Sequence, residues 1–243
     1  MGDDELAVVL ADEAGKLLLE LRETRPDLEG RALKDEGDLH SHNHLMKRLR
    51  EERPDDAILS EEGADDDARL SSERVWIVDP LDGTREYSEH RDDWAVHVAL
   101  WVRGELTTGA VALPGMGVTL SSANPPPLPK RPDGPLRLVV SRTRPPYETT
   151  LVAERLGCEL VEMGSAGAKA MSVLLGASDV YLHAGGQYEW DSAAPVAVAL
   201  GAGLHATRID GSPLIYNQMP PYLPDLIVCP KEVAAEVIAA ARP

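Results

Sequence analysis

The sequence predicts an α/β protein of two lobes, with an α+β lobe at residues 1–125 and an α/β lobe at residues 136–243. Three observations support this: helices mixed with short strands in the first half, a proline-rich connection, and alternating strands and helices after it. The connection, residues 121–135, has few apolar residues and suits an extended surface segment. A chain of 243 residues can bury a substantial core across such lobes.

In the first half, apolar residues between Leu6 and Leu21 recur on one helical face, which predicts a helix over 5–21. A second helix is expected over 39–52, because Pro54 stops it before the next strand. The expected strands are 57–60, 75–78, 94–102, 107–113 and 117–121. The strands 94–102 and 107–113 are joined by a short connection, which predicts an antiparallel pair.

In the second half, short apolar runs alternate with helical patterns, which favours layered α/β packing. The expected strands are 136–140, 159–163, 179–183 and 226–229. The expected helices are 148–156, 166–175, 191–200 and 233–241.

Composition limits the class of partner. Lys and Arg number 24 against 41 Asp and Glu, a net charge of −17, which disfavours nucleic-acid polymers and anionic membranes. A small anion can still bind where metal ions reverse the local charge. The acidic N-terminus is unlike a secretory leader, and no apolar run approaches the roughly 20 residues of a membrane span. With only Cys158 and Cys229, expected as buried thiols, the sequence predicts a cytoplasmic protein.

The main chemical signal is Asp79-Pro80-Leu81-Asp82-Gly83-Thr84, directly after the strand 75–78. It sets two carboxylates and a hydroxyl around a tight strand-to-helix turn, where Asp82 can cap the following helix beside a bound phosphate. Glu61 follows an upstream strand, and Asp191 lies far downstream. Hard oxygen ligands from three segments suit Mg²⁺. An isolated Asp-Gly pair is more often only a cap and a turn, but the fuller pattern favours a metal site.

These motifs resemble the signature of the lithium-sensitive inositol monophosphatase superfamily: a Glu-Glu pair after a strand, Asp-Pro-Ile/Leu-Asp-Gly-Thr, and a distant Trp-Asp. Arg85-Glu86-Tyr87 is similar to the CysQ-type 3'-phosphoadenosine 5'-phosphate phosphatases within it. The segments 164–169 and 189–194 extend the similarity over nearly the whole chain. The resemblance implies a layered αβαβα sandwich of the inositol monophosphatase and fructose-1,6-bisphosphatase type. It also implies a homodimer, with each site between two lobes.

The resemblance further implies two or three Mg²⁺ ions per site. Glu61, Asp79, the Leu81 carbonyl and Thr84 would hold the first, and Asp79, Asp82 and Asp191 the second. The catalytic residues would be Asp38, Thr84 and Glu61, with Thr84 and Asp38 activating a water. The alternative for Asp38 is an ordinary N-cap of the helix 39–52, after a shortened loop at 34–38. The residues implied to contact substrate are Asp82, Gly83, Thr84, Arg85, Ser165, Lys169 and Asp191.

The function implied is Mg²⁺-dependent removal of the 3'-phosphate of 3'-phosphoadenosine 5'-phosphate, giving AMP and phosphate in sulfur assimilation. The alternatives are inositol-1-monophosphatase or fructose-1,6-bisphosphatase activity, because a metal cradle for one phosphate does not choose the rest of the molecule. A non-catalytic interaction role is a further alternative. Ser165 and Lys169 could equally be structural, and Arg85 could be a solvated charge.

Overall fold

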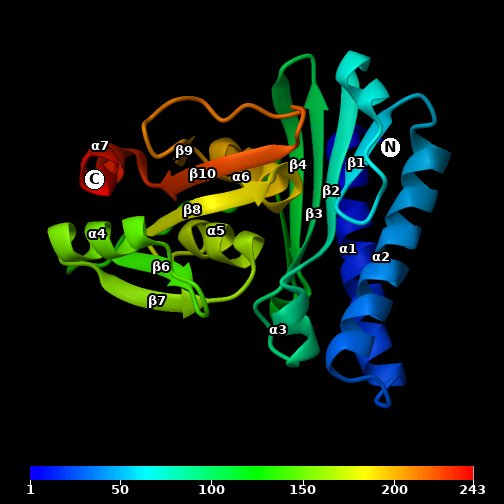
Figure 1. Cartoon of the computed structure of the whole chain (residues 1–243), viewed down its shortest axis with the longest axis horizontal. Helices are drawn as coiled ribbons and strands as arrows, with labels where there is room; N and C mark the ends of the chain where they lie inside the picture. Colours follow the sequence, from blue (N-terminus) through cyan, green and yellow to red (C-terminus); the bar gives the residue numbers. More distant parts are fainter. Residues whose placement is uncertain (243) are drawn as a thin grey trace.

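The computed structural model describes residues 1–242 and stacks its elements in five layers (Figure 1). The helices α1 (Asp3–Thr24) and α2 (Gly30–Glu52) cover one face of a first sheet. Between this sheet and a second lie α5 (Ala166–Leu174) and α6 (Ala193–Gly201). The outer layer is α4 (Tyr147–Leu156) and α7 (Lys231–Ala241). This order confirms the expected αβαβα fold class. Pro243, the last residue of the expected second lobe, lies outside the described residues.

The first sheet has the order β1-β2-β3-β4-β5. Its strands are β1 (Ala57–Ser60), β2 (Arg74–Asp82), β3 (Ala95–Val102), β4 (Glu105–Leu113) and β5 (Val118–Ser121). β1 runs parallel to β2, and the other neighbours are antiparallel. The antiparallel pairing expected for 94–102 and 107–113 is therefore confirmed. β2 runs on to Asp82 instead of ending before Asp79 as expected, so the turn to the helix begins at Gly83.

The second sheet has the order β7-β6-β8-β10-β9. Its strands are β6 (Arg137–Ser141), β7 (Glu159–Met163), β8 (Val180–Tyr188), β9 (His205–Thr207) and β10 (Tyr222–Cys229). β6 is parallel to β7 and β8, whereas β10 is antiparallel to β8 and β9. β8 continues past the expected end through Gly185 and Gly186, which both have positive φ and accompany an irregular register with β10.

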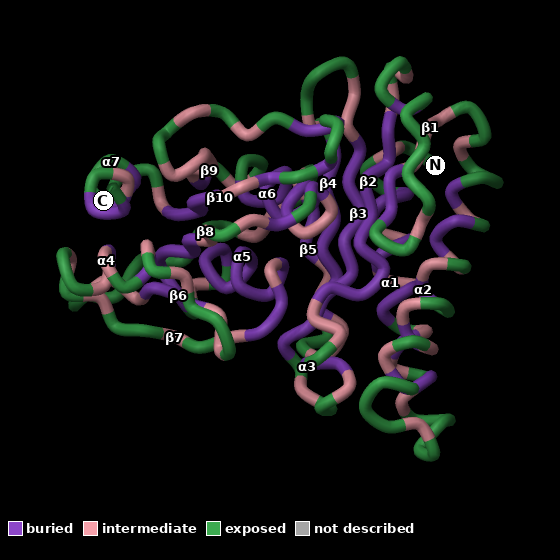
Figure 2. Tube along the Cα trace, in the orientation of Figure 1, coloured by how far each residue is buried: buried purple, intermediate pink, exposed green. Residues whose placement is uncertain are grey.

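Alternation along the strands divides the interior between the layers, and burial is concentrated in the strands of the first sheet (Figure 2). In β2, Trp76 and Val78 pack toward α1 and α2, whereas Val75 and Ile77 pack toward α5 and α6. Both faces of this sheet are therefore covered. Among the described residues, no helix combines the length and the apolar character needed to cross a membrane. Both cysteines are free thiols; Cys229 is buried as expected, but Cys158 is only partly buried.

The helix α2 begins at Gly30, well before the expected start at residue 39. The segment 34–38 is therefore helical and not a loop, and Asp38 lies inside α2, so the N-cap alternative for Asp38 is wrong. Close packing explains the difference. A Cβ atom at Gly37 would lie 2.9 Å from Tyr87 Cε1 and 3.0 Å from Leu81 Cδ2. Gly37 is thus required where α2 crosses the turn after β2, although glycine usually weakens a helix.

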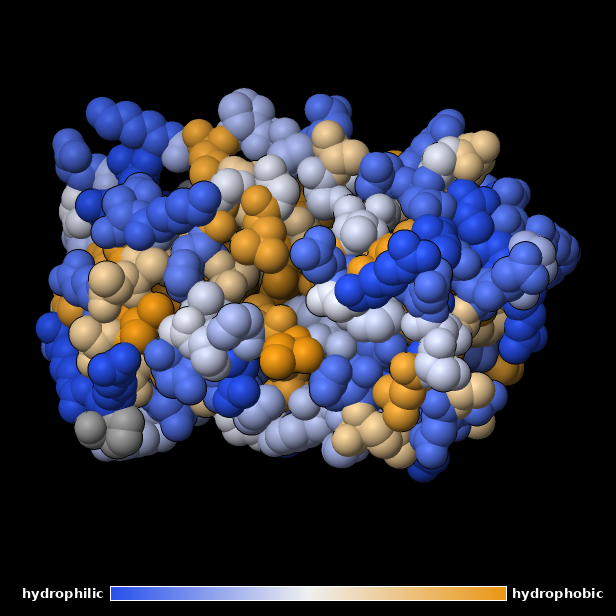
Figure 3. All heavy atoms as spheres, turned by 90° about the horizontal axis from the view of Figure 1, so that it is seen from above, coloured by the Kyte–Doolittle hydropathy of each residue, from blue (hydrophilic) through white to orange (hydrophobic). Residues whose placement is uncertain are grey.

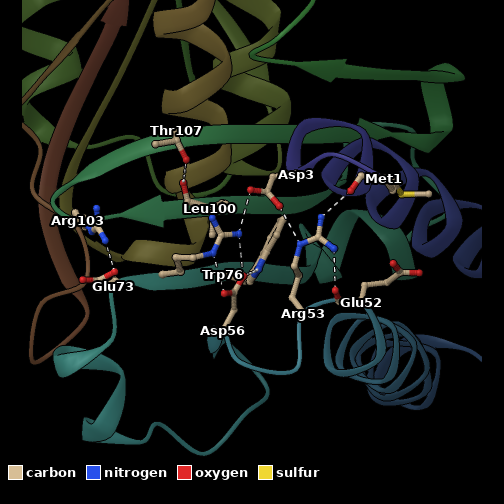
Figure 4. A network of polar contacts seen from close by, with 11 residues as sticks. Met1, Asp3, Glu52, Arg53, Asp56, Glu73, Trp76, Leu100, Arg103 and Thr107 are labelled. Carbon is tan, nitrogen blue, oxygen red and sulfur yellow. Dashed lines mark hydrogen bonds and ion pairs between the residues drawn. The ribbon is translucent and has the colours of Figure 1, made fainter.

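A polar network ties the start of α1 to the first sheet far from the turn after β2 (Figure 4). Asp56 accepts two hydrogen bonds from Arg74, at 2.8 and 3.0 Å, and one from Trp76 Nε1 at 2.8 Å. Asp3 at the N-terminus of α1 accepts from Arg53 and Arg74. The network fixes α1 against β2 through partly buried charges and has no contact with the candidate site.

Candidate metal centre and adjoining cavity

Three acidic side chains converge where β2 meets the layer of α5 and α6. Asp79 and Asp82 are buried at the end of β2, where the pairing with β3 is irregular between them. Asp191 belongs to the short 3-10 turn Glu189–Asp191 that follows β8. One carboxylate oxygen from each of the three lies within 4.8 Å of the others. The structure thus brings Asp79, Asp82 and Asp191 together from opposite halves of the chain.

Asp79 is the least satisfied of these acids. Its Oδ1 accepts a hydrogen bond from the Leu81 amide at 3.0 Å, but its buried Oδ2 has no partner among residues 1–242. Burial and the neighbouring Glu61, Asp82 and Asp191 carboxylates raise the pKa of Asp79 well above its ordinary value. A buried carboxylate oxygen without a donor is costly, and a divalent cation would satisfy it. The donor set therefore fits a metal ion.

Glu61 lies beside this cluster but is not one of the three acids whose oxygens lie within 4.8 Å of one another. Its backbone amide continues the pairing of β1 with β2, donating to the Val78 carbonyl at 3.4 Å. The residue is exposed as a whole and its carboxyl group makes no hydrogen bond within residues 1–242, but the carboxyl groups of Asp79 and Asp191 lie near enough to affect it. Desolvation of this carboxyl and the negative charge of Asp191 raise its pKa to about 7. Desolvation and Asp82 likewise raise the pKa of Asp191 to about 6. Four crowded carboxyl groups again favour cations between them.

Asp82 caps a different helix from the one expected. Its carboxylate accepts hydrogen bonds from the Ser165 hydroxyl at 2.5 Å and from the amides of Ala166 and Gly167 at 3.1 and 2.6 Å. These groups form the N-terminus of α5, whereas α3 (Thr84–Ser88) begins after Gly83 without a side-chain cap. The expected capping of α3 by Asp82 is therefore wrong. The single carboxylate instead links the end of β2 to α5.

His97 is part of the site, and sequence reasoning missed it. This buried side chain donates from Nδ1 to the Trp190 carbonyl at 3.0 Å, and its Nε2 lies 3.3 Å from Asp82 Oδ2. Burial lowers the pKa of His97, but the Asp82 carboxylate outweighs this and raises it. In turn, His97 holds the pKa of Asp82 below its ordinary value despite burial. The available signal was a single histidine on the same face of an apolar strand as Ala95 and Ala99.

The remaining residues expected in catalysis, Thr84 and Asp38, belong to neighbouring helices and are not bonded to each other within residues 1–242. Thr84 begins α3, and Asp38 lies on the part of α2 that packs against α3. No hydrogen bond joins the Asp38 carboxyl to the Thr84 hydroxyl within residues 1–242. Desolvation and the charge of Glu62 raise the pKa of Asp38 to about 7. The pairing of Asp38 with Thr84, and ligation by the Leu81 carbonyl, stay predictions.

A cavity of about 580 Å³ opens beside the acids and is lined by Asp82, Gly83 and Asp191 on one side. Ser165 and Lys169 line it as well, and both are largely engaged within the protein. The Ser165 hydroxyl also accepts from the Ala168 amide, capping α5. Lys169 Nζ donates to the carbonyls of Gly164 and Ser165, and burial lowers its pKa. Their role in substrate contact stays a prediction.

The far side of this cavity carries aromatic rings and unpartnered polar groups from β8 and β10. The half-exposed Tyr188 and Tyr222 have ring centroids 6.3 Å apart, and Tyr188 stacks on Trp190 at 4.7 Å. Gln187 is only 7% exposed, and neither its Oε1 nor its Nε2 has a hydrogen-bond partner in the described part of the chain. Sequence reasoning missed these residues, although Gln187 and Tyr188 directly precede the Glu-Trp-Asp segment.

A second, basic pocket of about 310 Å³ adjoins the cavity and shares Gly83, Ser165 and Lys169 with it. Its basic residues are Lys34, Arg85, Arg142, Arg144 and Lys169. Arg142 is held in ion pairs with Glu86 and Glu89 at 2.9 and 2.6 Å. Arg85 and Arg144 are exposed and form no ion pair within residues 1–242. In a chain of charge −17, this pocket is a local site suited to an anion.

Comparison with known proteins gives consistent matches over most of the chain. The model of the inositol monophosphatase family matches residues 4–243. The 3'-phosphoadenosine 5'-phosphate phosphatase of Mycobacterium tuberculosis is 53% identical over 241 residues, covering 94% of this chain and 89% of that protein. The 3'(2'),5'-bisphosphate nucleotidase CysQ of Escherichia coli is 31% identical over 197 residues, covering 76% of this chain and 80% of that protein.

Solved structures share the fold at lower identity. Inositol monophosphatase II of Staphylococcus aureus is 20% identical with a TM-score of 0.80, covering 98% of this chain and 94% of that chain. CysQ of Bacteroides thetaiotaomicron is 26% identical with a TM-score of 0.79, covering 94% of this chain and 97% of that chain. These likenesses agree with the five-layer arrangement of helices and sheets.

Proposed function

The chain belongs to the inositol monophosphatase family, and from this premise we propose that it removes the 3'-phosphate of 3'-phosphoadenosine 5'-phosphate, releasing AMP and phosphate. Enzymes of this family are metal-dependent phosphatases. The observation that carries the choice of substrate is the cavity beside the acidic cluster, with aromatic rings and an unpartnered amide at one side and a basic pocket adjoining it. The relatives named for this nucleotide support the same choice.

We propose Mg²⁺ as the metal, with two or three ions per site, of which two have assigned ligands. The first ion would be held by Glu61, Asp79, the Leu81 carbonyl and Thr84, and the second by Asp79, Asp82 and Asp191. When bound, these ions supply positive charge for the phosphoryl group and the leaving oxygen. The buried, unpartnered Oδ2 of Asp79 supports its place between the two ions.

The chain's own residues would move the proton and orient the nucleotide. A carboxyl group with a pKa of about 7, as Asp38 has, can accept a proton near neutral pH. We propose that Asp38 takes the proton of the attacking water through the Thr84 hydroxyl, with Glu61 also contacting that water. His97 keeps Asp82 ionised and fixed against α5, which supports the ligand geometry.

The rest of the nucleotide would be held by groups lining the cavity and the basic pocket. Tyr188 and Tyr222 offer aromatic faces for the purine base, since base stacking on such rings is favourable. The Gln187 amide carries one donor and one acceptor side by side, the pattern that pairs with adenine. Arg85 and Arg144 would receive the 5'-phosphate. We propose that Gly83, Ser165 and Lys169, which line both the cavity and the basic pocket, contact the phosphate end of the nucleotide.

Phosphate release tests the proposal, with the nucleotide, inositol 1-phosphate and fructose 1,6-bisphosphate each assayed with and without Mg²⁺. We expect kcat/KM for the nucleotide to exceed the other two by about 100-fold, because only the nucleotide uses the base-binding groups. A higher kcat/KM for inositol 1-phosphate or for the sugar bisphosphate would overturn the choice of substrate. Absence of Mg²⁺-dependent turnover with all three would overturn the enzymatic function and favour an interaction role.

We further propose that the protein is a homodimer and that each chain has two lobes, at 1–125 and 136–243. We also propose that it acts in the cytoplasm, in sulfur assimilation. Exposed apolar residues support an interface: Figure 3 shows such residues among hydrophilic ones on one face. Leu200 and Leu214 line a groove of about 430 Å³, and Leu200 and Ile215 are exposed. The two lobes are supported by the order of the strands in the sequence: those of the first sheet all precede the connection 121–135, and those of the second sheet all follow it. Light scattering on the purified protein tests the dimer, and a monomeric mass would refute it.

A further inference from the structure

A buried arginine outside the cavity connects the two halves of the chain. Arg69 lies in the 3-10 turn Asp67–Ser71, on the connection between β1 and β2 that begins at Glu61, and is 2% exposed. It donates two hydrogen bonds to the Asp65 carboxylate, at 2.7 and 3.0 Å. It also donates to Asn217 Oδ1 at 2.6 Å and to the Gln218 carbonyl at 2.8 Å. The contacts with 217–218 cross from the first half to the second.

The same dipeptide is held from its other side by a buried glutamate. The two carboxylate oxygens of Glu189 accept from the amides of Asn217 and Gln218, each at 2.7 Å. The Asn217 side-chain amide returns a bond to the Arg69 carbonyl at 3.3 Å. Glu189 is fully buried and begins the turn Glu189–Asp191. An unbroken series of contacts therefore runs from the segment after Glu61 to the turn that carries Asp191.

We propose that Arg69 and Glu189 are positioning residues, which hold Glu61, proposed for the first ion, and Asp191, proposed for the second, at the separation that the two ions together require. These two carboxylates come from opposite halves of the chain and repel each other. Without a restraint, this repulsion would separate the two halves of the chain at the site. Binding of the metal ions would then have to bring the carboxylates back together, which would weaken metal affinity. Arg69 resists this through two charge-assisted, partly buried bonds to Asp65 and its bonds to 217–218. The inference rests on the metal centre proposed above.

A positioning role differs from a structural role in its effect on metal affinity. Mn²⁺ binding is measured by calorimetry on the full chain for wild type, Arg69→Met and Glu189→Gln, and unfolding temperature is recorded in parallel. We expect the half-saturating Mn²⁺ concentration to rise about 10-fold in both variants, as when outer-shell partners of ligands are lost. We expect kcat at saturating Mg²⁺ to stay near that of wild type, because the ligands themselves remain.

Two further variants keep the test decisive. Asn217→Gly removes both side-chain contacts between Asn217 and Arg69 at a position with φ of 61°, which glycine adopts freely, so it serves if Arg69→Met does not fold. Its half-saturating Mn²⁺ concentration should also rise. Arg137→Met is the matched control, because Arg137 makes the same bidentate contact with Asp179 and a bond to the Gly176 carbonyl within one half. It should lower the unfolding temperature and leave Mn²⁺ affinity unchanged.

The outcomes separate this inference from the proposed function. If wild type binds Mn²⁺ and the variants of Arg69, Glu189 and Asn217 bind it equally well, the positioning role is refuted and the metal centre stands. If the Arg137→Met control weakens Mn²⁺ binding as much as they do, general destabilisation explains the effect and the positioning role is also refuted. If wild type binds no Mn²⁺, the metal centre and the positioning role fall together.

Discussion

Replacing Asp79 and Asp82 by asparagine should have opposite effects on stability and the same effect on activity. Asp79 is buried with one oxygen unpartnered, and nearby carboxylates raise its pKa. A neutral amide there relieves repulsion, so without metal Asp79→Asn should stabilise the fold by about 1 to 2 kcal/mol. Asp82 instead accepts three hydrogen bonds and contacts His97. Asp82→Asn leaves a buried donor and a buried cation unpaired, costing about 3 to 5 kcal/mol.

Thermal unfolding in EDTA measures these changes. At about 2 to 4 °C per kcal/mol for a chain of this size, we expect Asp79→Asn to unfold a few degrees above wild type. Asp82→Asn should unfold roughly 6 to 20 °C below wild type by the same conversion. Added Mg²⁺ should raise the unfolding temperature of wild type more than that of either variant. Both variants should lose kcat by about 10³-fold or more, because each would remove a charged group that we propose as a metal ligand.

The comparison can refute the reasoning in two ways. If Asp79→Asn destabilises the metal-free protein as much as Asp82→Asn does, then Asp79 is a structural acid and the crowded cluster does not strain the fold. If either variant keeps wild-type kcat, the corresponding residue is no metal ligand, whatever its stability.

Three other predictions follow from separate parts of the molecule. Gln187→Leu should raise KM for the nucleotide about 10-fold and leave hydrolysis of a small aryl phosphate unchanged, as steady-state kinetics would show. In EDTA, the free energy of unfolding should fall as pH rises from about 4 toward 8. Folding raises the pKa of Glu61 to about 7 and that of Asp191 to about 6, so the folded protein binds more protons than the unfolded chain over this range. An unfolding temperature that rises with pH over this range would contradict the clustering of these acids. Arg74→Met should cost about 2 kcal/mol in urea unfolding and leave kcat/KM intact, since its bonds to Asp56 lie away from the cavity.

Local patterns predicted the strands and the acidic motif well. The run Val75-Trp76-Ile77-Val78 and the turn after it are contiguous, so their pattern reflects local structure. The start of α2 was misplaced because Gly37 resembles a helix breaker, whereas packing against Tyr87 and Leu81 requires it. Such a requirement depends on residues distant in the chain and leaves no local signal. The three-residue strand β9 is too short to show alternation.

The site itself was only partly predictable, because its polar contacts span the chain. The bond between Asp82 and Ser165 joins residues 83 apart in sequence, so nothing near Asp82 could indicate which helix it caps. His97 and Gln187 sit in strands whose pattern explains burial but not a polar partner. The close approach of His97 to Gly167 also joins distant parts of the chain and could not be predicted locally. A Cβ atom at Gly167 would lie 2.0 Å from His97 Nε2.

Asp82 has two roles, as a proposed metal ligand and as the acceptor of bonds from α5, which restricts how the metal preference of this enzyme could be redesigned. A change at Asp82 that suits a softer ion would also detach α5 from β2, since the same oxygens accept its backbone amides. The Glu61 side chain makes no comparable anchoring bonds within residues 1–242. Histidine or cysteine libraries aimed at new ion selectivity should therefore recover folded clones mainly from position 61.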